Sequence, residues 1–195
     1  MIQSTIIALL SCLVAGFLFF AYRKLVFLAN EQYDAWGNVA DQQQKLLAGI
    51  ADVMQLAGKL FDRQKRRDVI SATKYLIGLE EMQIAAIADA QQSLVLDLLA
   101  CLSTVSNQQI DAEDFDRWLA CQDEIMSAID DLYLAQQHYN TITRAFNRWQ
   151  NHLWVYWMAD SLRYRKQPLI NIETNQKSYD EYVAFESYVQ PLSRD

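Results

Sequence analysis

The sequence has few residues that interrupt helices. Its 195 residues include only 5 glycines and 2 prolines, and both prolines, Pro168 and Pro191, lie near the C-terminus. Proline breaks a helix from inside, and an all-β fold needs many turn residues. The chain is therefore predicted to be all-helical, without an all-β domain.

Positive charge and cysteine are also limited. The net charge is -7, which disfavours a broad surface for nucleic acid. Three cysteines are too few for a disulfide scaffold, so we expect Cys12, Cys101 and Cys121 to be small, buried and reduced. A single bond between Cys101 and Cys121 is the alternative if this part of the chain faces an oxidising compartment.

A long apolar run occupies the N-terminus. Residues 1–22 carry no charged side chain, and Arg23 and Lys24 follow at once. About 20 apolar residues in a helix match the roughly 30 Å hydrocarbon core of a bilayer. We therefore expect residues 1–22 to be an uncleaved transmembrane anchor in the lipid bilayer. A cleaved signal peptide is the alternative, although no basic residue precedes the apolar run.

The flanking charges predict the orientation of this anchor. No lysine or arginine precedes the apolar run, whereas Arg23 and Lys24 follow it. Positive charges favour the cytoplasmic side of a membrane. The prediction is a single-pass protein of the cell (inner) membrane, with its N-terminus outside and its C-terminal domain in the cytoplasm.

Apolar residues after the anchor recur every three or four positions, which is typical of helices with one buried face. The first stretch has no stop signal before it and can continue the anchor as one helix. Short connections predict an antiparallel bundle of three long helices, with a fourth if the last one folds back. The predicted helices cover residues 30–61, 68–105 and 112–163. The bundle domain is expected over residues 23–170, followed by a polar tail over residues 171–195.

Two motifs resemble a known family. Residues 30–39 read NEQYDAWGNV shortly after the anchor, and residues 139–147 read YNTITRAFN late in the last helix. Together they resemble the LemA family of bacterial membrane proteins, of which this chain would be a divergent member. Residues 162–170 are similar to the basic and aromatic segment that ends the family domain. The resemblance implies one N-terminal transmembrane helix and a cytoplasmic helical bundle, without a generally assigned activity.

No pattern of catalytic or cofactor-binding residues is present. The two histidines, His138 and His152, belong to no Glu-x-x-His unit, which a two-metal helical bundle needs. The sequence also lacks a nucleophile elbow, a phosphate loop and a dinucleotide fingerprint. Asp116, Asp123 and Asp130 recur every seven residues, and we interpret them as a solvated helix face rather than a cation site. We expect no catalytic residue, no metal and no cofactor.

The YN and FN pairs are expected to be structural. Tyr139 and Phe146 are seven residues apart, as are Asn140 and Asn147, so each pair shares one side of a helix. We expect the aromatic rings to fill the core and the amides to bond across helices, fixing their register. Trp36 belongs to the apolar stripe of the first helix and is assigned the same structural role. The alternative is that the four residues line a groove.

The best candidates for partner binding are basic and aromatic residues. The basic residues lie around the first turn, and the helix lengths place the aromatic ones level with it, at the end of the bundle far from the membrane. Aromatic and arginine residues together are common anchors of protein interfaces. The alternatives are that the tryptophans cap the core or rest on the membrane surface. The candidates are Arg63, Lys65, Arg66, Arg67, Trp149, Trp154 and Trp157.

These observations favour a membrane-anchored scaffold or adaptor that recruits a protein partner, without catalytic activity or nucleic-acid binding. The alternative is a homo-oligomeric structural bundle that organises the membrane. An enzyme of unrecognised type is the third reading, because chemistry can be built from residues scattered along a sequence.

Overall fold

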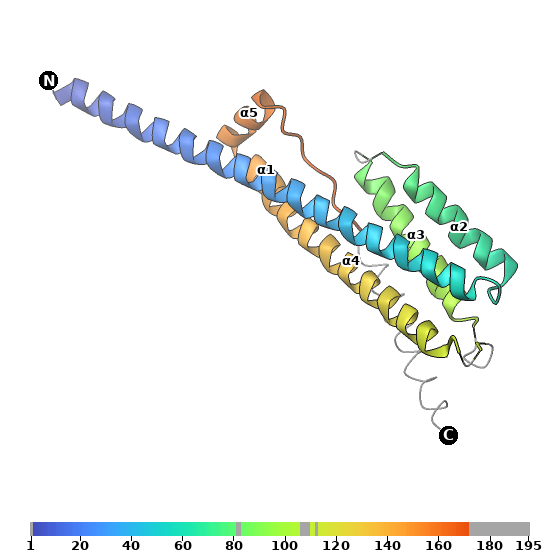
Figure 1. Cartoon of the computed structure of the whole chain (residues 1–195). Helices are drawn as coiled ribbons and strands as arrows, with labels where there is room; N and C mark the ends of the chain where they lie inside the picture. The colour runs from blue at the N-terminus through green and yellow to red at the C-terminus, as the bar shows by residue number, and fades with distance from the viewer. Residues whose placement is uncertain (1, 81–82, 106–109, 112, 172–195) are drawn as a thin grey trace. The chain divides into compact units, whose positions relative to one another are not determined.

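The computed structural model describes residues 2–80, 83–105, 110–111 and 113–171, and these residues form five helices and no strand (Figure 1). The prediction of an all-helical chain is confirmed for the described residues. All but the first residue of the predicted polar tail, residues 171–195, lie outside them.

Helix α1, Ile2–Ala57, joins the apolar run and the first predicted helix without a break. It is long because no proline interrupts it and because, beyond the apolar run, its apolar residues keep helical spacing. The helix ends before Gly58, where a Cβ atom would collide with the backbone oxygen of Met54. A turn follows, in which the Leu60 amide donates to the Ala57 carbonyl at 2.9 Å.

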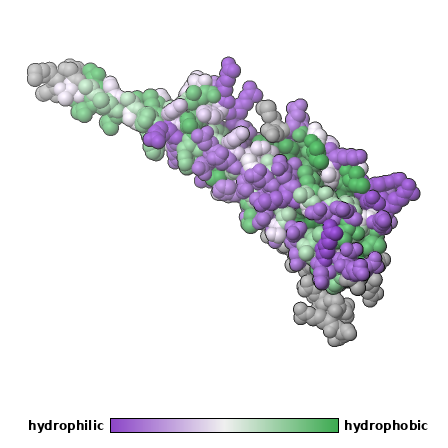
Figure 2. Space-filling model, in the orientation of Figure 1, coloured by the Kyte–Doolittle hydropathy of each residue, from purple (hydrophilic) through white to green (hydrophobic). Residues whose placement is uncertain are grey.

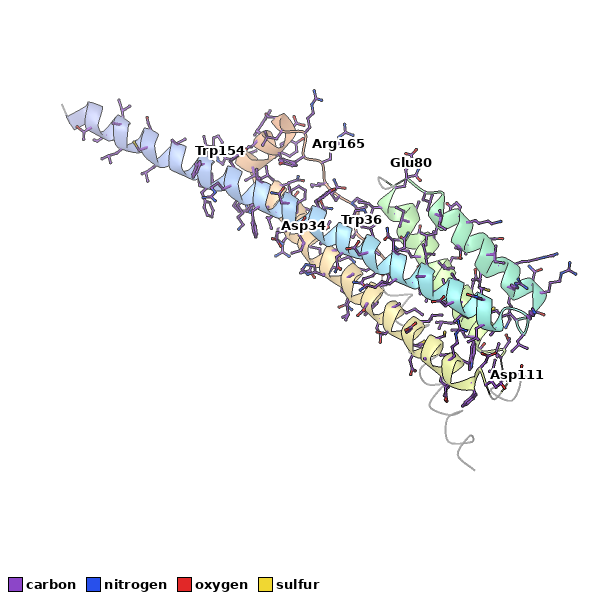
Figure 3. All side chains as sticks on the ribbon, viewed as in Figure 1. Asp34, Trp36, Glu80, Asp111, Trp154 and Arg165 are labelled. Carbon is purple, nitrogen blue, oxygen red and sulfur yellow. The ribbon has the colours of Figure 1, made fainter. Side chains whose placement is uncertain are left out.

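The prediction of a single helix over residues 68–105 is wrong, because the structure has two helices there. Helix α2, Arg63–Ile77, begins earlier than expected, with the Asp62 carboxylate accepting from the Gln64 amide at 2.9 Å. It ends at Gly78, whose amide donates to two carbonyls of the last turn. Helix α3, Ile84–Leu102, follows, and Figure 3 labels Glu80 on the connection between them.

Helices α2 and α3 pack against each other. The Lys65 ammonium, in the first turn of α2, donates to the Ala100 carbonyl in the last turn of α3 at 3.0 Å. This contact satisfies a carbonyl at a helix C-terminus, where a cation is favourable. By length and composition α1 and α3 could each cross a membrane. However, α3 has ten buried residues, as expected for the core helix of a folded unit.

The third predicted helix also breaks in two. Helix α4, Phe115–Gln150, is followed by the short helix α5, Leu153–Ser161. Between them the Asn151 amide donates to the Arg148 carbonyl and the His152 amide to the Trp149 carbonyl, so the chain turns tightly. Neither glycine nor proline marks this break. The sequence pattern left open whether the last helix folds back, and in the structure α5 is a separate helix.

The contacts divide the chain into two units. The anchor unit consists of Met1–Gly37 and His138–Leu169, and the hairpin unit of Asn38–Gln137 and Ile170–Asp195. Helices α1 and α4 each contribute to both. The predicted boundary between residues 22 and 23 coincides with none of the three unit boundaries, which follow residues 37, 137 and 169.

Three glutamines link three helices inside the hairpin unit. The Gln91 amide of α3 donates to Gln43 Oε1 on α1 at 2.7 Å, and the Gln136 amide of α4 donates to Gln91 Oε1 at 2.8 Å. Gln91 and Gln136 are each only 1% exposed. A buried polar chain of this kind stabilises one register of the helices, because slippage would leave its members unpaired.

Replacing Gln91 by leucine should destabilise the hairpin unit by about 2 kcal/mol, because the partly buried Gln43 and the buried Gln136 lose their shared partner. Chemical denaturation of the full chain in detergent measures the loss. Gln44→Leu, at an exposed position of α1, is the matched control. Leucine at positions 43, 91 and 136 together should recover part of the stability. An unchanged denaturation midpoint for Gln91→Leu would show that the three hydrogen-bonded glutamines do not contribute to stability.

Candidate interaction surfaces

The core of the anchor unit joins α1, α4 and α5. Its buried members are Ala21, Leu25 and Leu28 of α1, Phe146 of α4, and Val155 and Ala159 of α5. Since Val155 and Ala159 are the buried residues of α5, this core fixes the short helix on α1 immediately after the apolar run.

Tyr139 is the centre of a polar contact within this unit. Its ring is fully buried and meets Trp36 edge-on, with ring centres 5.5 Å apart. Its hydroxyl accepts from the Gln32 amide at 3.2 Å and donates to the Pro168 carbonyl at 3.2 Å. Burial raises the pKa of the Tyr139 hydroxyl, so it remains a donor.

Asn147 holds the segment that follows α5. Its Nδ2 donates to the Gln167 carbonyl at 2.8 Å, and its Oδ1 accepts from the Gln167 amide at 3.1 Å. For Asn147, the prediction of a bond to another helix is wrong, because both bonds reach the backbone of the segment that follows α5. Phe146 is buried and meets Tyr164 of the same segment edge-on at 6.2 Å, and Asn140 is buried as well.

Trp149 lies against the end of the apolar run of α1. Its ring is 6.4 Å from that of Phe20 and 5.1 Å from that of His152. The Lys24 ammonium stands 4.2 Å from the centre of the Trp149 ring, within the range of a cation–π contact. Trp149 therefore marks the level at which apolar side chains of α1 give way to basic ones.

Helix α5 buries one face and exposes apolar side chains on the other. Val155 is 1% exposed, whereas Trp154 is 65% and Trp157 is 66% exposed. Leu153 and Tyr156 are also exposed. Figure 3 labels Trp154 on α5 and Arg165 on the segment that follows it. A helix in water normally turns polar side chains outward. An exposed apolar face of this kind is typical of a surface that contacts a partner or a membrane.

The C-terminus of α5 contains a strained basic residue. The Tyr164 amide donates to the Ala159 carbonyl at 2.9 Å, and the Arg163 amide to the Asp160 carbonyl at 3.0 Å. This pattern is a Schellman motif, which glycine usually completes. Here Arg163 adopts φ 59°, at a cost of about 1 kcal/mol for a side chain with a Cβ atom.

The basic candidates lie on α2. Arg63, Arg66 and Arg67 are exposed on its first turns, and Lys65 is engaged with Ala100. Ile70 and Ile77 of the same helix are also exposed. This helix has five basic residues and one acidic residue in a chain whose net charge is -7.

The basic and the aromatic candidates belong to different units. Arg63, Lys65, Arg66 and Arg67 belong to the hairpin unit, whereas Trp149, Trp154 and Trp157 belong to the anchor unit. The expectation that they lie level assumed one helix between the first turn and the last long helix. The break at Gly78 adds a second one, and the C-terminal part of α4 meets α1 near Phe20 and Lys24.

The remaining chemical candidates are dispersed. Asp116, Asp123 and Asp130 are all exposed. Among the residues that the structure describes, no three histidine, cysteine, aspartate or glutamate side chains gather where they could hold a metal ion.

The cysteines are free, with Cys101 and Cys121 buried and Cys12 exposed on the apolar run. The expectation of buried reduced thiols therefore holds for two of the three. Burial raises the pKa of the Cys101 thiol from 9.0 to about 11, and outweighs the opposing effect of Lys65. The folded state therefore favours the protonated thiol, and the stability that this contributes is lost as the pH rises from 9 towards 11.

Alkylation of Cys101 at pH 8 should be about 100-fold slower than that of an ordinary thiol, since two pKa units reduce the reactive thiolate a hundredfold. Mass spectrometry after iodoacetamide treatment of the full chain in detergent measures the rate. Ser103→Cys, at an exposed position two residues away, supplies the ordinary thiol for comparison. Equal rates at the two positions would contradict the burial of Cys101.

No protein-family model matches the chain, and no curated protein matches it.

Proposed function

We propose that this chain is a single-pass membrane protein with its N-terminus outside and its C-terminal helices in the cytoplasm. The support is the apolar surface of α1. Large apolar side chains from Ile6 to Phe20 are exposed along it, whereas a protein folded in water would bury such a run (Figure 2). Arg23 and Lys24 follow, and both are exposed. Cytoplasmic membranes retain such basic flanks on their inner side.

The helices beyond the anchor are proposed to form an antiparallel bundle, and the chain to be a divergent relative of the LemA family. Contacts within each unit support the arrangement. In the anchor unit Trp149 meets Phe20, while Tyr139 meets Trp36. Residue numbers therefore rise along α4 as they fall along α1, as in an antiparallel pair of helices. In the hairpin unit the first turn of α2 contacts the last turn of α3. The family proposal depends on the motifs over residues 30–39, 139–147 and 162–170. Within the second of these, Tyr139, Phe146 and Asn147 contact the segment over residues 164–168.

The function that the geometry supports best is that of a non-catalytic scaffold, which recruits a protein partner to the membrane through the exposed face of α2. The observation that carries it is the combination of three exposed arginines and two exposed isoleucines on this basic helix. Such a face matches a partner surface that is acidic and partly apolar.

Self-association is the second candidate, and the exposed acidic residues of α4 favour it. Asp116, Asp123, Glu124 and Asp131 are exposed and opposite in charge to α2. A second copy could therefore present the acidic surface that α2 fits.

Photo-crosslinking in native membranes tests both candidates. A probe at Ile70, an exposed position of the same helix, should give one discrete adduct to another protein, and Arg63→Glu, Arg66→Glu and Arg67→Glu together should remove it without lowering helicity. The control carries Lys45→Glu, Lys59→Glu and Arg117→Glu, which reverse three exposed charges of the same unit. An adduct only to a second copy would favour self-association. An adduct that survives the reversal on α2, or no adduct at all, would overturn the scaffold proposal.

A further inference from the structure

The exposed face of α5 is placed where a membrane surface would meet it. Val155 and Ala159 share one buried core with Ala21 and Leu25, at the end of the apolar run of α1. Leu153, Trp154, Tyr156 and Trp157 remain exposed on its other sides. The apolar run and α5 both belong to the anchor unit, so their contact lies within one unit.

The residue types around α5 are those of the bilayer interface. Tryptophan and tyrosine concentrate at the level of lipid headgroups, where their rings are apolar and their polar atoms can reach water. Trp149 meets both Phe20, near the end of the apolar run, and Lys24, among the first cations after it. The same level therefore holds the end of the apolar run, four exposed apolar side chains and a ring in contact with a cation.

The segment after α5 adds positive charge. Arg163, Arg165 and Lys166 are exposed within four positions, while Asp160 is the one acidic residue of α5. Arg163 occupies a backbone position that glycine would fill without strain. A charged side chain at a strained position is a starting point for a functional hypothesis. Phosphate groups of lipids are anions that arginine and lysine bind at membrane surfaces.

We propose that α5 lies in the interfacial layer of the leaflet from which α1 emerges. Trp154 and Trp157 rest among the headgroups and the upper acyl chains, and Arg163, Arg165 and Lys166 bind headgroup phosphates. The lipid surface is the occupant because the exposed face continues from the apolar run of α1. This inference rests on the proposed membrane anchor, and it is independent of any partner of α2.

Quenching by brominated lipids tests the position of α5. The full chain is placed in nanodiscs of phosphatidylethanolamine and phosphatidylglycerol, with bromine near the headgroup end of the acyl chains. The emission of Trp154 and Trp157 is the difference between the unchanged protein and a variant that carries both Trp154→Phe and Trp157→Phe. Brominated lipid should quench this emission several-fold. The emission removed by the control Trp118→Phe, at a fully buried core position, should be unquenched. Unquenched emission from positions 154 and 157 would overturn the proposal.

The cations are tested by varying the lipid charge. Raising the phosphatidylglycerol content should shift the emission of Trp154 and Trp157 to shorter wavelength. Arg163→Gly, Arg165→Gln and Lys166→Gln together should abolish this dependence, whereas Lys45→Gln, Lys59→Gln and Arg117→Gln together should preserve it. Glycine adopts the backbone conformation of Arg163 without strain, so Arg163→Gly should not unfold the end of α5. A dependence that survives the three substitutions would overturn the phosphate contacts.

Extraction with alkaline carbonate separates this inference from the anchor on which it rests. A chain that is released from membranes lacks the anchor, and both proposals then fail. A chain that stays in the membrane while Trp154 and Trp157 remain unquenched keeps its anchor, and only the interfacial position of α5 is overturned.

Discussion

Replacing Phe146 by alanine should destabilise the anchor unit by about 3 to 5 kcal/mol, the usual cost of deleting a large buried aromatic side chain. Phe146 is 2% exposed and packs with Leu25, Val155 and Ala159 in one core. Its ring also supports Tyr164 of the segment after α5. The cavity would therefore remove the support of α5 from two directions.

Chemical denaturation of the full chain in detergent measures the loss, and hydrogen exchange in nanodiscs locates it. The amides of α5 should exchange faster than in the unchanged protein, while those of α3 should keep their protection, because α3 belongs to the hairpin unit. Leu134→Ala, at an exposed position of the same helix, is the control. A loss below about 1 kcal/mol would mean that Phe146 does not connect the three helices.

Helical periodicity predicts α1 well because the signal is long and uninterrupted. Apolar residues at three- and four-residue spacing bury the same face over many turns, as at Leu46, Ile50 and Val53. No proline interrupts the helix, and the glycines inside it do not break it.

The two unpredicted breaks have different physical reasons. Gly37 and Gly49 lie inside α1, whereas Gly78 ends α2, so an isolated glycine in a helical pattern has either outcome. The break before α5 has no local signal at all. There Val155 and Ala159 pack on α1, and tertiary contacts with residues more than a hundred positions away decide where the chain turns.

The predicted positions of the basic and aromatic candidates depended on where the helices break. Helix lengths place two segments level only if the number of helices between them is known. One extra helix reverses the direction expected for α4, and Trp149 near its end meets Phe20 of α1. The spacing of Tyr139 and Phe146 indicated that they share one side of α4. Nothing in the spacing could identify the partner of Asn147, because backbone groups of an extended segment leave no pattern in a sequence.

Replacing Asn147 by alanine should release the segment over residues 164–168, because both hydrogen bonds to Gln167 are lost at once. Two such bonds contribute about 2 kcal/mol, which corresponds to roughly 30-fold more frequent opening of the segment. Trypsin cleaves after Arg165 and Lys166, so cleavage of the full chain in nanodiscs should accelerate by a similar factor when opening limits access. Asn147→Asp should act at least as strongly, since it sets a carboxylate oxygen against the Gln167 carbonyl.

The control for Asn147 is Asn151→Ala, which removes a different bond to the same segment. Asn151 Oδ1 accepts from the Lys166 ammonium at 2.6 Å, but the contact is exposed and water can replace it. Cleavage should therefore change little in this variant. If both variants accelerate cleavage equally, the segment is held by its contacts in general rather than by Asn147. If neither does, Tyr139 and the packing of Tyr164 on Phe146 are sufficient to hold it.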